Sequence, residues 1–289
     1  HFCPCQSLMI VICFLANVKV EQNMESNEYV SLPFAALQNL AQMDSTAVRR
    51  QLSKALSAMH RKIIVLDDDP TGVQTVHNVS VYTHWDYASI LEGFQEPSPM
   101  FFLLTNSRAF SREETERVHM EIARNISKAA EQTKKDFLVI SRGDSTLRGH
   151  YPLETETLRA VLEKETGKVY LGEVLLPYFL EGNRFTLHNI HNIREGDLLI
   201  PVGQTEFAQD KTFGYRSSHL GHWCEEKTEG KYRASDMIYL SVQDLRTLQP
   251  EVIAKRLLAA RGFAKIIVNA VAPTEVEAFC IALCFAVAA

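Results

Sequence analysis

From Arg61 to the end of the chain, short runs of apolar residues alternate with stretches of helical periodicity. The apolar runs are continuous, which is typical of strands buried on both faces of a parallel sheet. Such strands alternating with helices predict an α/β fold with an open, mostly parallel sheet flanked by helices. We predict strands at 62–66, 78–83, 100–105, 136–140, 169–177, 237–240 and 265–269, and helices at 111–133, 152–165 and 250–260.

Two parts of the chain depart from this alternation. The segment 182–236 is rich in glycine, histidine and charge, so we expect a loop-rich excursion or a small subdomain there. Residues 24–60 carry a helical pattern and precede the first predicted strand. We therefore divide the chain into an N-terminal extension over 1–60 and a Rossmann-like, three-layer α/β domain over 61–289.

The two ends of the chain differ from those of an ordinary domain. The apolar run LMIVICFLANV (8–18) is too short to span a bilayer. It fits the core of a signal peptide without a basic flank, or else residues 1–23 are not native and Met24 is the natural start, which we favour. At the other end, FCIALCFAVAA (279–289) has the pattern of a helix that stops without a cap, so we expect the natural protein to continue.

Charge and cysteine content disfavour several classes of partner. The formal net charge is −5, so no basic surplus exists to neutralise a nucleic-acid backbone. The six cysteines include no CxxC pair and do not resemble a disulfide framework, which favours a cytoplasmic protein. With no membrane-spanning run either, we predict no nucleic-acid or membrane partner. Any anion has to be bound by individually placed arginines and backbone N–H groups.

Polar clusters follow four of the predicted strands, at the point where each strand ends. They are DDDPTG (67–72), NSR (106–108), SRGDSTLRGH (141–150) and EGNR (181–184). Because ligands of open parallel sheets bind outside the carboxyl ends of the strands, we expect these clusters to converge on one rim. Any one of them alone is explained equally well as a solvated loop.

Three consecutive aspartates, Asp67, Asp68 and Asp69, end the first predicted strand. Three like charges in a row repel, so we expect a cation to answer them, either Mg²⁺ or a basic group of a ligand. The alternative is a strand-end turn capped by one aspartate, which Pro70 and Gly72 support. We favour a functional role, because a turn does not need three carboxylates.

The cluster SRGDSTLRGH offers both donors for an anion and a candidate base. Arg142 and Arg148 provide planar guanidinium groups for a carboxylate or phosphate, and Asp144 can accept a proton from an attacking hydroxyl. A salt bridge between Asp144 and one arginine is the alternative, and it leaves the other arginine unexplained. Further donors or close backbone contacts are expected from Ser145, Thr146, Gly143 and Gly149.

Weaker candidates lie elsewhere in the chain. Arg184 is a candidate anion clamp, and Asn106, Ser107 and Arg108 form a smaller polar set. The histidines and cysteine of HLGHWC (219–224), with LHNIH (187–191), match no standard zinc spacing, so we predict no metal ligand. Neither GxGxxG nor GxxxxGK[ST] occurs, and the sequence therefore shows no nucleotide loop.

One motif resembles that of a different enzyme class. DDDPT (67–71) after a strand fits D-x-D-x-T, which resembles the first motif of haloacid-dehalogenase-type phosphatases. The resemblance implies Asp67 as nucleophile, Asp69 as acid–base and Thr105 as the second motif. No lysine motif followed by an acidic pair appears, and SRGDSTLRGH is left without a role.

The full set of motifs, DDPTG (68–72), RGDSTLRGH (142–150) and GNR (182–184), resembles the N-terminal domain of the four-carbon acid-sugar kinases. The resemblance covers about residues 61–289, and DSTLRG is its most specific part. Arg142 stands where a lysine is usual, His150 where an asparagine is common, and Asn183 separates the glycine from the arginine of the third motif. The first motif continues as VQT (73–75), without the later acidic residue of many members. These departures affect the substrate more than the fold.

The resemblance implies an ATP-dependent kinase that phosphorylates a hydroxyl of a small sugar acid such as threonate, erythronate or 3-oxo-tetronate. ATP and Mg²⁺ would be bound mainly by a C-terminal domain that this chain does not contain, and Asp144 or Asp69 would orient or deprotonate the hydroxyl. A phosphatase and a non-catalytic sugar-acid-binding fragment are the alternatives, and a homo-oligomer is left open. The residues predicted to bind the substrate are Asp68, Thr71, Gly72, Asn106, Ser107, Arg108, Arg142, Ser145, Thr146, Arg148, Gly149 and Arg184.

Overall fold

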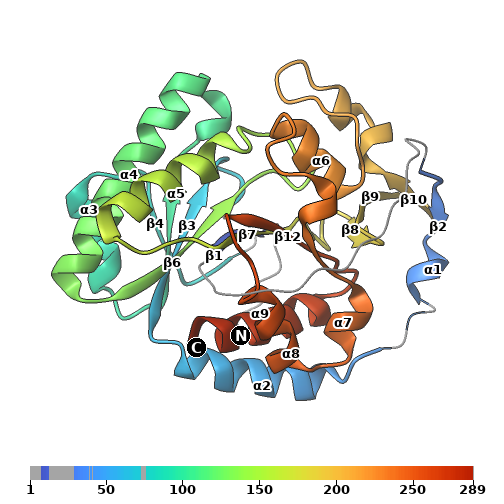
Figure 1. Ribbon diagram of the computed structural model, residues 1–289, viewed down its shortest axis with the longest axis horizontal. Helices are drawn as coiled ribbons and strands as arrows, with labels where there is room; N and C mark the ends of the chain where they lie inside the picture. The colour runs from blue at the N-terminus through green and yellow to red at the C-terminus, as the bar shows by residue number, and fades with distance from the viewer. Residues whose placement is uncertain (1–7, 13–28, 39, 41, 73–75, 289) are drawn as a thin grey trace.

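An eight-stranded sheet forms the centre of the protein (Figure 1). The computed structural model describes residues 8–12, 29–38, 40, 42–72 and 76–288, with the backbone alone for 8–12. Within these residues, neighbouring strands run parallel except at β1, which lies antiparallel between β6 and β7. The strand order is β11-β12-β7-β1-β6-β3-β5-β4, with β1 Leu8–Ile12, β3 Arg61–Asp67, β4 Ser80–Tyr82, β5 Met100–Leu104, β6 Asp136–Arg142, β7 Gly172–Leu176, β11 Ile238–Leu240 and β12 Ala264–Val268.

Helices cover both faces of this sheet, which confirms the predicted α/β fold (Figure 1). Ile64 and Phe101 point from β3 and β5 into the core beneath α3, α4 and α5. Val65 and Phe102, one residue further along each strand, point into the opposite core, which α7, α8 and α9 fill. Burial on both faces explains the continuous apolar runs. The bounds are α3 Tyr87–Gln95, α4 Arg112–Thr133 and α5 Leu153–Thr166 on one face, and α7 Val242–Arg246, α8 Pro250–Leu257 and α9 Pro273–Ala288 on the other.

The segment 182–236 forms a small subdomain with a sheet of its own (Figure 1). Its strands are antiparallel and short. The mixed polarity of RFTL and IHNIRE, and the shortness of LLIP, gave no strand signal in the sequence. The strand order is β2-β10-β9-β8, with β2 Leu32–Pro33, β8 Arg184–Leu187, β9 Ile190–Glu195 and β10 Leu198–Pro201, followed by α6 Leu220–Lys227 and the short helices η3 Val202–Gln204, η4 Glu206–Gln209 and η5 Ala234–Asp236.

The N-terminal region contributes to both sheets. β1 enters the large sheet and β2 the small one, and neither strand was predicted. The predicted helical character of 24–60 is present as α1 (Ala35–Gln38) and α2 (Ser45–Ala58), and α2 packs Val48 and Leu52 against Ile281 of α9. No helix among the described residues is long and apolar enough to cross a membrane. Cys3, Cys5, Cys13 and the VQT segment lie outside the described residues.

Candidate functional site

The carboxyl ends of β3, β5 and β6 lie side by side on one edge of the large sheet. In the sheet register, Asp67 at the end of β3 pairs with Arg142 of β6 on one side and Leu104 of β5 on the other. The polar clusters that follow these three strands therefore start next to one another, at the rim where a parallel sheet binds ligands. The cluster at Arg184 begins β8 and belongs to the subdomain.

Two arginines of the chain form ion pairs with the three consecutive aspartates, and we call this group the aspartate side of the site. Arg108 donates from Nε and Nη2 to both oxygens of Asp68, at 2.9 and 2.7 Å, and from Nη1 to Asp69 at 3.0 Å. Arg142 donates from Nη1 to Asp67 at 3.2 Å. The positive charges beside the aspartates therefore come from arginines of the protein itself. From the sequence we had expected Mg²⁺ or a basic group of a ligand.

Asp67 is closed off from solvent by the turn that follows it. Its side chain is 0% exposed, and a Cβ added at Gly72 would lie 2.2 Å from its Oδ2. A side chain at position 72 would therefore require Asp67 or Arg142 to shift. The hydroxyl of Thr105 donates to the backbone carbonyl of Asp67, not to its carboxylate. A buried Asp67 is poorly placed to act as a nucleophile, so the geometry does not favour the phosphatase alternative.

The three aspartates differ in their protonation behaviour. Burial raises the pKa of Asp67 to about 6 in spite of the charge of Arg142. Burial likewise raises the pKa of Asp68 to about 6, although Arg108 opposes this. Burial would also raise the pKa of Asp69, but hydrogen bonds from Thr71 outweigh it and the pKa is lowered. Neighbouring carboxylates with pKa values pushed apart are typical of sites that move protons.

Asp144 is bonded within its own loop. It accepts hydrogen bonds from the hydroxyl of Thr146 and from Nε of Arg148, the latter at 2.7 Å. Burial would raise the pKa of Asp144, but the bond from Thr146 and the charges of Arg108 and Arg148 lower it. Arg142 is held by Asp67, so both arginines of SRGDSTLRGH have a partner within the protein. The salt-bridge alternative predicted a partner for one arginine and left the other unexplained.

The subdomain holds this loop in place from the other side. The hydroxyl of Tyr215 donates to the carbonyl of Thr146 at 2.6 Å, and Nε2 of His191 lies 2.8 Å from the carbonyl of Ser145. Gly149 has a φ of 143°, a value that residues with a Cβ rarely adopt. The backbone of the DSTLRG motif is thus fixed by the fold before any ligand binds.

Arg148 and Arg184 lie on opposite elements and share one aromatic ring, and we call them, with Phe207, the arginine side. Their guanidinium carbons lie 5.0 and 5.4 Å from the centre of the Phe207 ring, which belongs to η4. Arg148 also approaches Asp210 at 3.9 Å. Nε of Arg184 is buried without a hydrogen-bond partner among the described residues, and burial lowers the pKa of Arg184.

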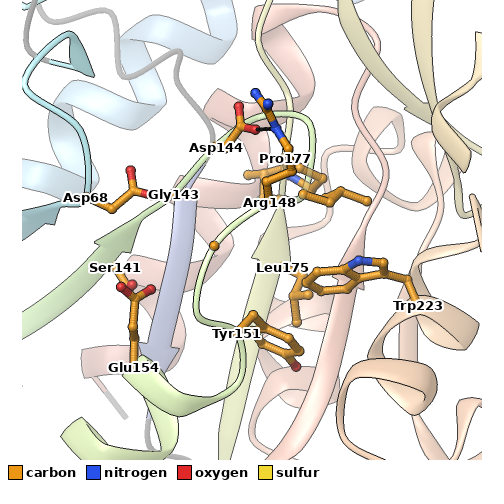
Figure 2. Close-up of a pocket in the computed structure, with 13 residues that line it drawn as sticks. Asp68, Ser141, Gly143, Asp144, Arg148, Tyr151, Glu154, Leu175, Pro177 and Trp223 are labelled. Atoms are coloured by element: carbon orange, nitrogen blue, oxygen red, sulfur yellow. Dashed lines mark hydrogen bonds and ion pairs between the residues drawn. The ribbon is translucent and has the colours of Figure 1, made fainter. Parts of the chain in front are cut away.

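A recess opens between the two sides (Figure 2). Asp68, Ser141 and Glu154 lie on one side of it, and Leu175 and Trp223 on the other. Its volume is about 50 Å³, so it encloses one end of a small ligand and leaves the rest on the open rim. The full lining is Asp68, Ser141, Gly143, Asp144, Leu147, Arg148, Gly149, Tyr151, Glu154, Leu175, Leu176, Pro177 and Trp223.

Several residues predicted to bind a ligand are bonded within the protein. The hydroxyl of Ser107 donates to Glu154, and that of Thr71 donates to Asp69, each at 2.6 Å. Asn106 has a φ of 54° and begins the short helix η2 (Ser107–Ala109). Of the predicted residues, the structure places Asp68, Asp144, Arg148 and Gly149 on the recess itself.

Four residues of the site were not predicted from the sequence. Glu154 stands in the first turn of α5, where an acidic residue is usual at any helix start, so it carried no signal. Tyr151 follows the DSTLRGH motif and has the appearance of a core aromatic. Trp223 and Phe207 come from the subdomain, whose position against the rim was not predictable.

The histidines of HLGHWC and LHNIH lie in separate places and do not form a common site. His191 supports the Ser145 carbonyl, while Cys224 is buried next to the Tyr151 hydroxyl. His219 packs its ring against His222 at 4.7 Å near the start of α6. No group of three or more metal-binding side chains occurs in the part of the chain that the structure describes.

Comparison with known proteins places this geometry in a family. The family model described as sugar-binding N-terminal domain matches residues 63–288. The chain belongs to this family. The match confirms the resemblance that DDPTG, RGDSTLRGH and GNR indicated, over nearly the same residues. In this sugar-binding domain, residues of DDPTG and RGDSTLRGH line the recess, whereas GNR lies at the start of β8.

Two solved structures are similar to this sugar-binding domain. A domain of unknown function (DUF1537) from Bordetella bronchiseptica, crystallised as a domain-swapped dimer with bound citrate, has a TM-score of 0.51 and 19% identity, covering 76% of this chain and 50% of that one. A DUF1537 protein of Haemophilus influenzae has a TM-score of 0.47 and 13% identity, covering 76% of this chain and 55% of that one. This chain thus spans about half the length of these proteins. No curated protein matches the sequence.

Proposed function

We propose that this chain is the sugar-acid-binding half of an ATP-dependent kinase that phosphorylates a hydroxyl of a small, four-carbon sugar acid. The arginine side carries the proposal. Nε of Arg184 is buried without a partner among the described residues, and Arg148 lies beside it over the same ring. A carboxylate beside these guanidinium groups would supply the missing acceptor and balance the charge of Arg184, since Arg148 is already paired with Asp144.

The aspartate side has a different task in this proposal. Asp68 lines the recess and has a pKa of about 6, which suits a group that accepts a proton near neutral pH. Asp144 and Asp69, the bases expected from the sequence, both have a lowered pKa, whereas the pKa of Asp68 is raised. We therefore propose that Asp68 accepts the proton of the attacking hydroxyl, while Asp144 orients Arg148 toward the substrate.

The described carboxylates do not fit a Mg²⁺ site of their own. Asp68 and Asp69 are both held by Arg108, whose charge takes the place that a cation would need. We therefore place the binding of ATP and Mg²⁺ outside this chain and derive no step through them. Phosphoryl transfer depends mostly on positioning and electrostatics, and this domain would position the acceptor hydroxyl.

Calorimetry with L-threonate and D-erythronate tests the binding part of the proposal. We expect the wild-type chain to bind at least one of these acids and Arg184→Ala to bind it roughly 10- to 150-fold more weakly, because a charge-assisted hydrogen bond is lost. Arg216→Ala is the matched control, since this arginine belongs to the same subdomain and its side chain is 86% exposed. Equal affinity of Arg184→Ala and wild type would contradict the assignment.

Activity of the longer protein tests the kinase part. Threonate-dependent conversion of ATP to ADP is expected with the natural protein, and Asp68→Asn should abolish it with little change in threonate affinity. Binding without turnover in the longer protein would favour the non-catalytic alternative instead. Citrate, a hydroxy acid bound by the Bordetella protein, serves as a second probe of the anion site. A cytoplasmic location and a homo-oligomer stay predictions.

A further inference from the structure

Glu154 is a buried acid of the recess for which the proposed mechanism has no role. Its side chain is 8% exposed, and its carboxyl lines the recess together with Asp68. Figure 2 shows it rising from the start of α5 on the same side as Asp68 and Ser141, opposite Trp223. Buried carboxyl groups are costly unless they are paired with a cation or keep their proton.

The contacts of Glu154 provide no such cation. Its Oε1 accepts a hydrogen bond from the hydroxyl of Ser107 at 2.6 Å. Of the described residues, only His119 brings a basic nitrogen within 4.0 Å of the carboxyl, with Nε2 at 3.8 Å from Oε1. No described residue is hydrogen-bonded to Oε2, which leaves this oxygen for the recess.

His119 is itself neutral. Its Nδ1 lies 2.8 Å from the carbonyl of Thr115, and because a carbonyl only accepts, Nδ1 carries the ring proton. Burial lowers the pKa of His119 to about 4, so Nε2 presents a lone pair to Glu154. A lone pair facing the carboxyl favours the protonated acid over the carboxylate.

Asp68 decides where the negative charge of the recess resides. Two hydrogen bonds from Arg108 stabilise the ionised form of Asp68, whereas Glu154 has none from a cation. Burial raises the pKa of Glu154, and the hydrogen bond from Ser107 and the charges of His150 and Arg108 only partly oppose this rise. Across the recess, Asp144 and Arg148 neutralise each other. Of the two carboxyls, Glu154 therefore has no hydrogen-bonded cation among the described residues to stabilise its ionised form, whereas Asp68 has one.

We propose that Glu154 is a further ligand-binding residue, which stays a neutral carboxylic acid and donates a hydrogen bond from Oε2 to an oxygen of the bound sugar acid. The inference rests on the proposed function, and it explains how a recess with three acidic side chains accepts an anion. An ionised Glu154 would repel the ligand, and a protonated one adds a donor opposite the arginine side. Ser107 and His119 act as positioning residues for it.

Calorimetry with L-threonate and D-erythronate at several pH values tests this role in the chain. We expect Glu154→Gln to keep its affinity within about threefold, because an amide also donates, and Glu154→Ala to lose roughly tenfold or more. Wild-type affinity should fall as pH rises and Glu154 ionises, while Glu154→Gln should show a weaker fall. Glu165→Gln is the matched control, since Glu165 is exposed on the same helix.

Infrared difference spectroscopy tests the protonation state without a ligand. A C=O band of a protonated carboxyl should be present in the wild type at neutral pH and absent in Glu154→Gln, with Glu165→Gln unchanged. The inference would be overturned if Glu154→Gln lost no such band. It would also be overturned if Glu154→Gln bound as weakly as Glu154→Ala and kept the pH profile of the wild type. A wild-type chain that binds neither acid would overturn the proposed function instead, and the infrared band would still decide whether Glu154 is neutral.

Discussion

The aspartate side and the arginine side of the rim each contain two arginines, and carboxylates hold both arginines of the first side but only Arg148 of the second. On the aspartate side, Arg108 and Arg142 are each held by carboxylates that are almost fully buried. On the arginine side, Arg148 and Arg184 face an aromatic ring, and Nε of Arg184 lacks a partner among the described residues. An arginine near a binding site is therefore not by itself a ligand contact. Its availability depends on the partner that the fold has already given it.

The largest expected effect concerns stability on the aspartate side. Arg108→Ala leaves Asp68 as a buried carboxylate without its cation, so we expect the free energy of unfolding to fall by roughly 3–5 kcal/mol. Denaturation in urea measures it, with Arg117→Ala, an exposed residue of α4, as the control. Arg108→Met combined with Asp68→Asn should recover part of the loss, because the buried charge at position 68 is then removed together with its partner. A fall no larger than the control's would show that Arg108 is not structural.

A second effect on the same side depends on pH. The pKa of Asp67 is raised from 3.8 to about 6, so the folded state binds its proton more tightly than the unfolded state does. The stability that this provides is complete below pH 3.8 and is lost as pH rises through about 6, by roughly 3 kcal/mol in total.

Urea denaturation at several pH values between about 3.5 and 7 covers this window. The loss would appear as a change in the stability difference between wild type and Asp67→Asn. In Asp67→Asn the group no longer titrates, so the stability of wild type relative to this variant should fall across the window. Asp197→Asn, at an exposed aspartate, should leave the profile of the wild type unchanged. Parallel profiles for Asp67→Asn and wild type would contradict the raised pKa.

Much of the large sheet could be predicted from the sequence, because burial on both faces makes each strand a continuous apolar run. KIIVL, MFFLLT and DFLVI became β3, β5 and β6, and Ser111 caps α4 by accepting from the N–H of Glu114. β1 was not predicted, because its apolar run stands far from the other strands in sequence. The strands of the subdomain are short and mixed in polarity, and only their tertiary packing makes them strands.

The position of the site at one edge of the sheet was predictable, but the hydrogen bonds and ion pairs between its side chains were not. Parallel topology brings the strand ends together, and the residues that follow β3, β5 and β6 meet there as expected. The sequence does not show that Arg108 is held by Asp68, or that Ser107 is bonded to Glu154, since both contacts join segments far apart in the chain. The contribution of Phe207 was hidden for the same reason.

The smallest expected effect lies on the arginine side and concerns the ring of Phe207. Phe207→Leu keeps an apolar side chain but removes the π face over which Arg148 and Arg184 lie. A cation–π contact at a partly exposed site contributes about 0.5–1 kcal/mol, so threonate affinity should fall roughly two- to fivefold. Calorimetry measures the change.

Phe213→Leu is the control for this substitution, because the ring of Phe213 packs against His150 at 4.9 Å and not against an arginine. Unchanged affinity in Phe207→Leu would mean that Asp144 and Asp210 position Arg148, and the Gly182 carbonyl positions Arg184, without the ring. A modest loss confined to Phe207→Leu would sharpen the contrast between the two sides. Carboxylates would then fix the arginines that stabilise the fold, and the aromatic ring would help to hold Arg184, whose Nε stays available to a ligand.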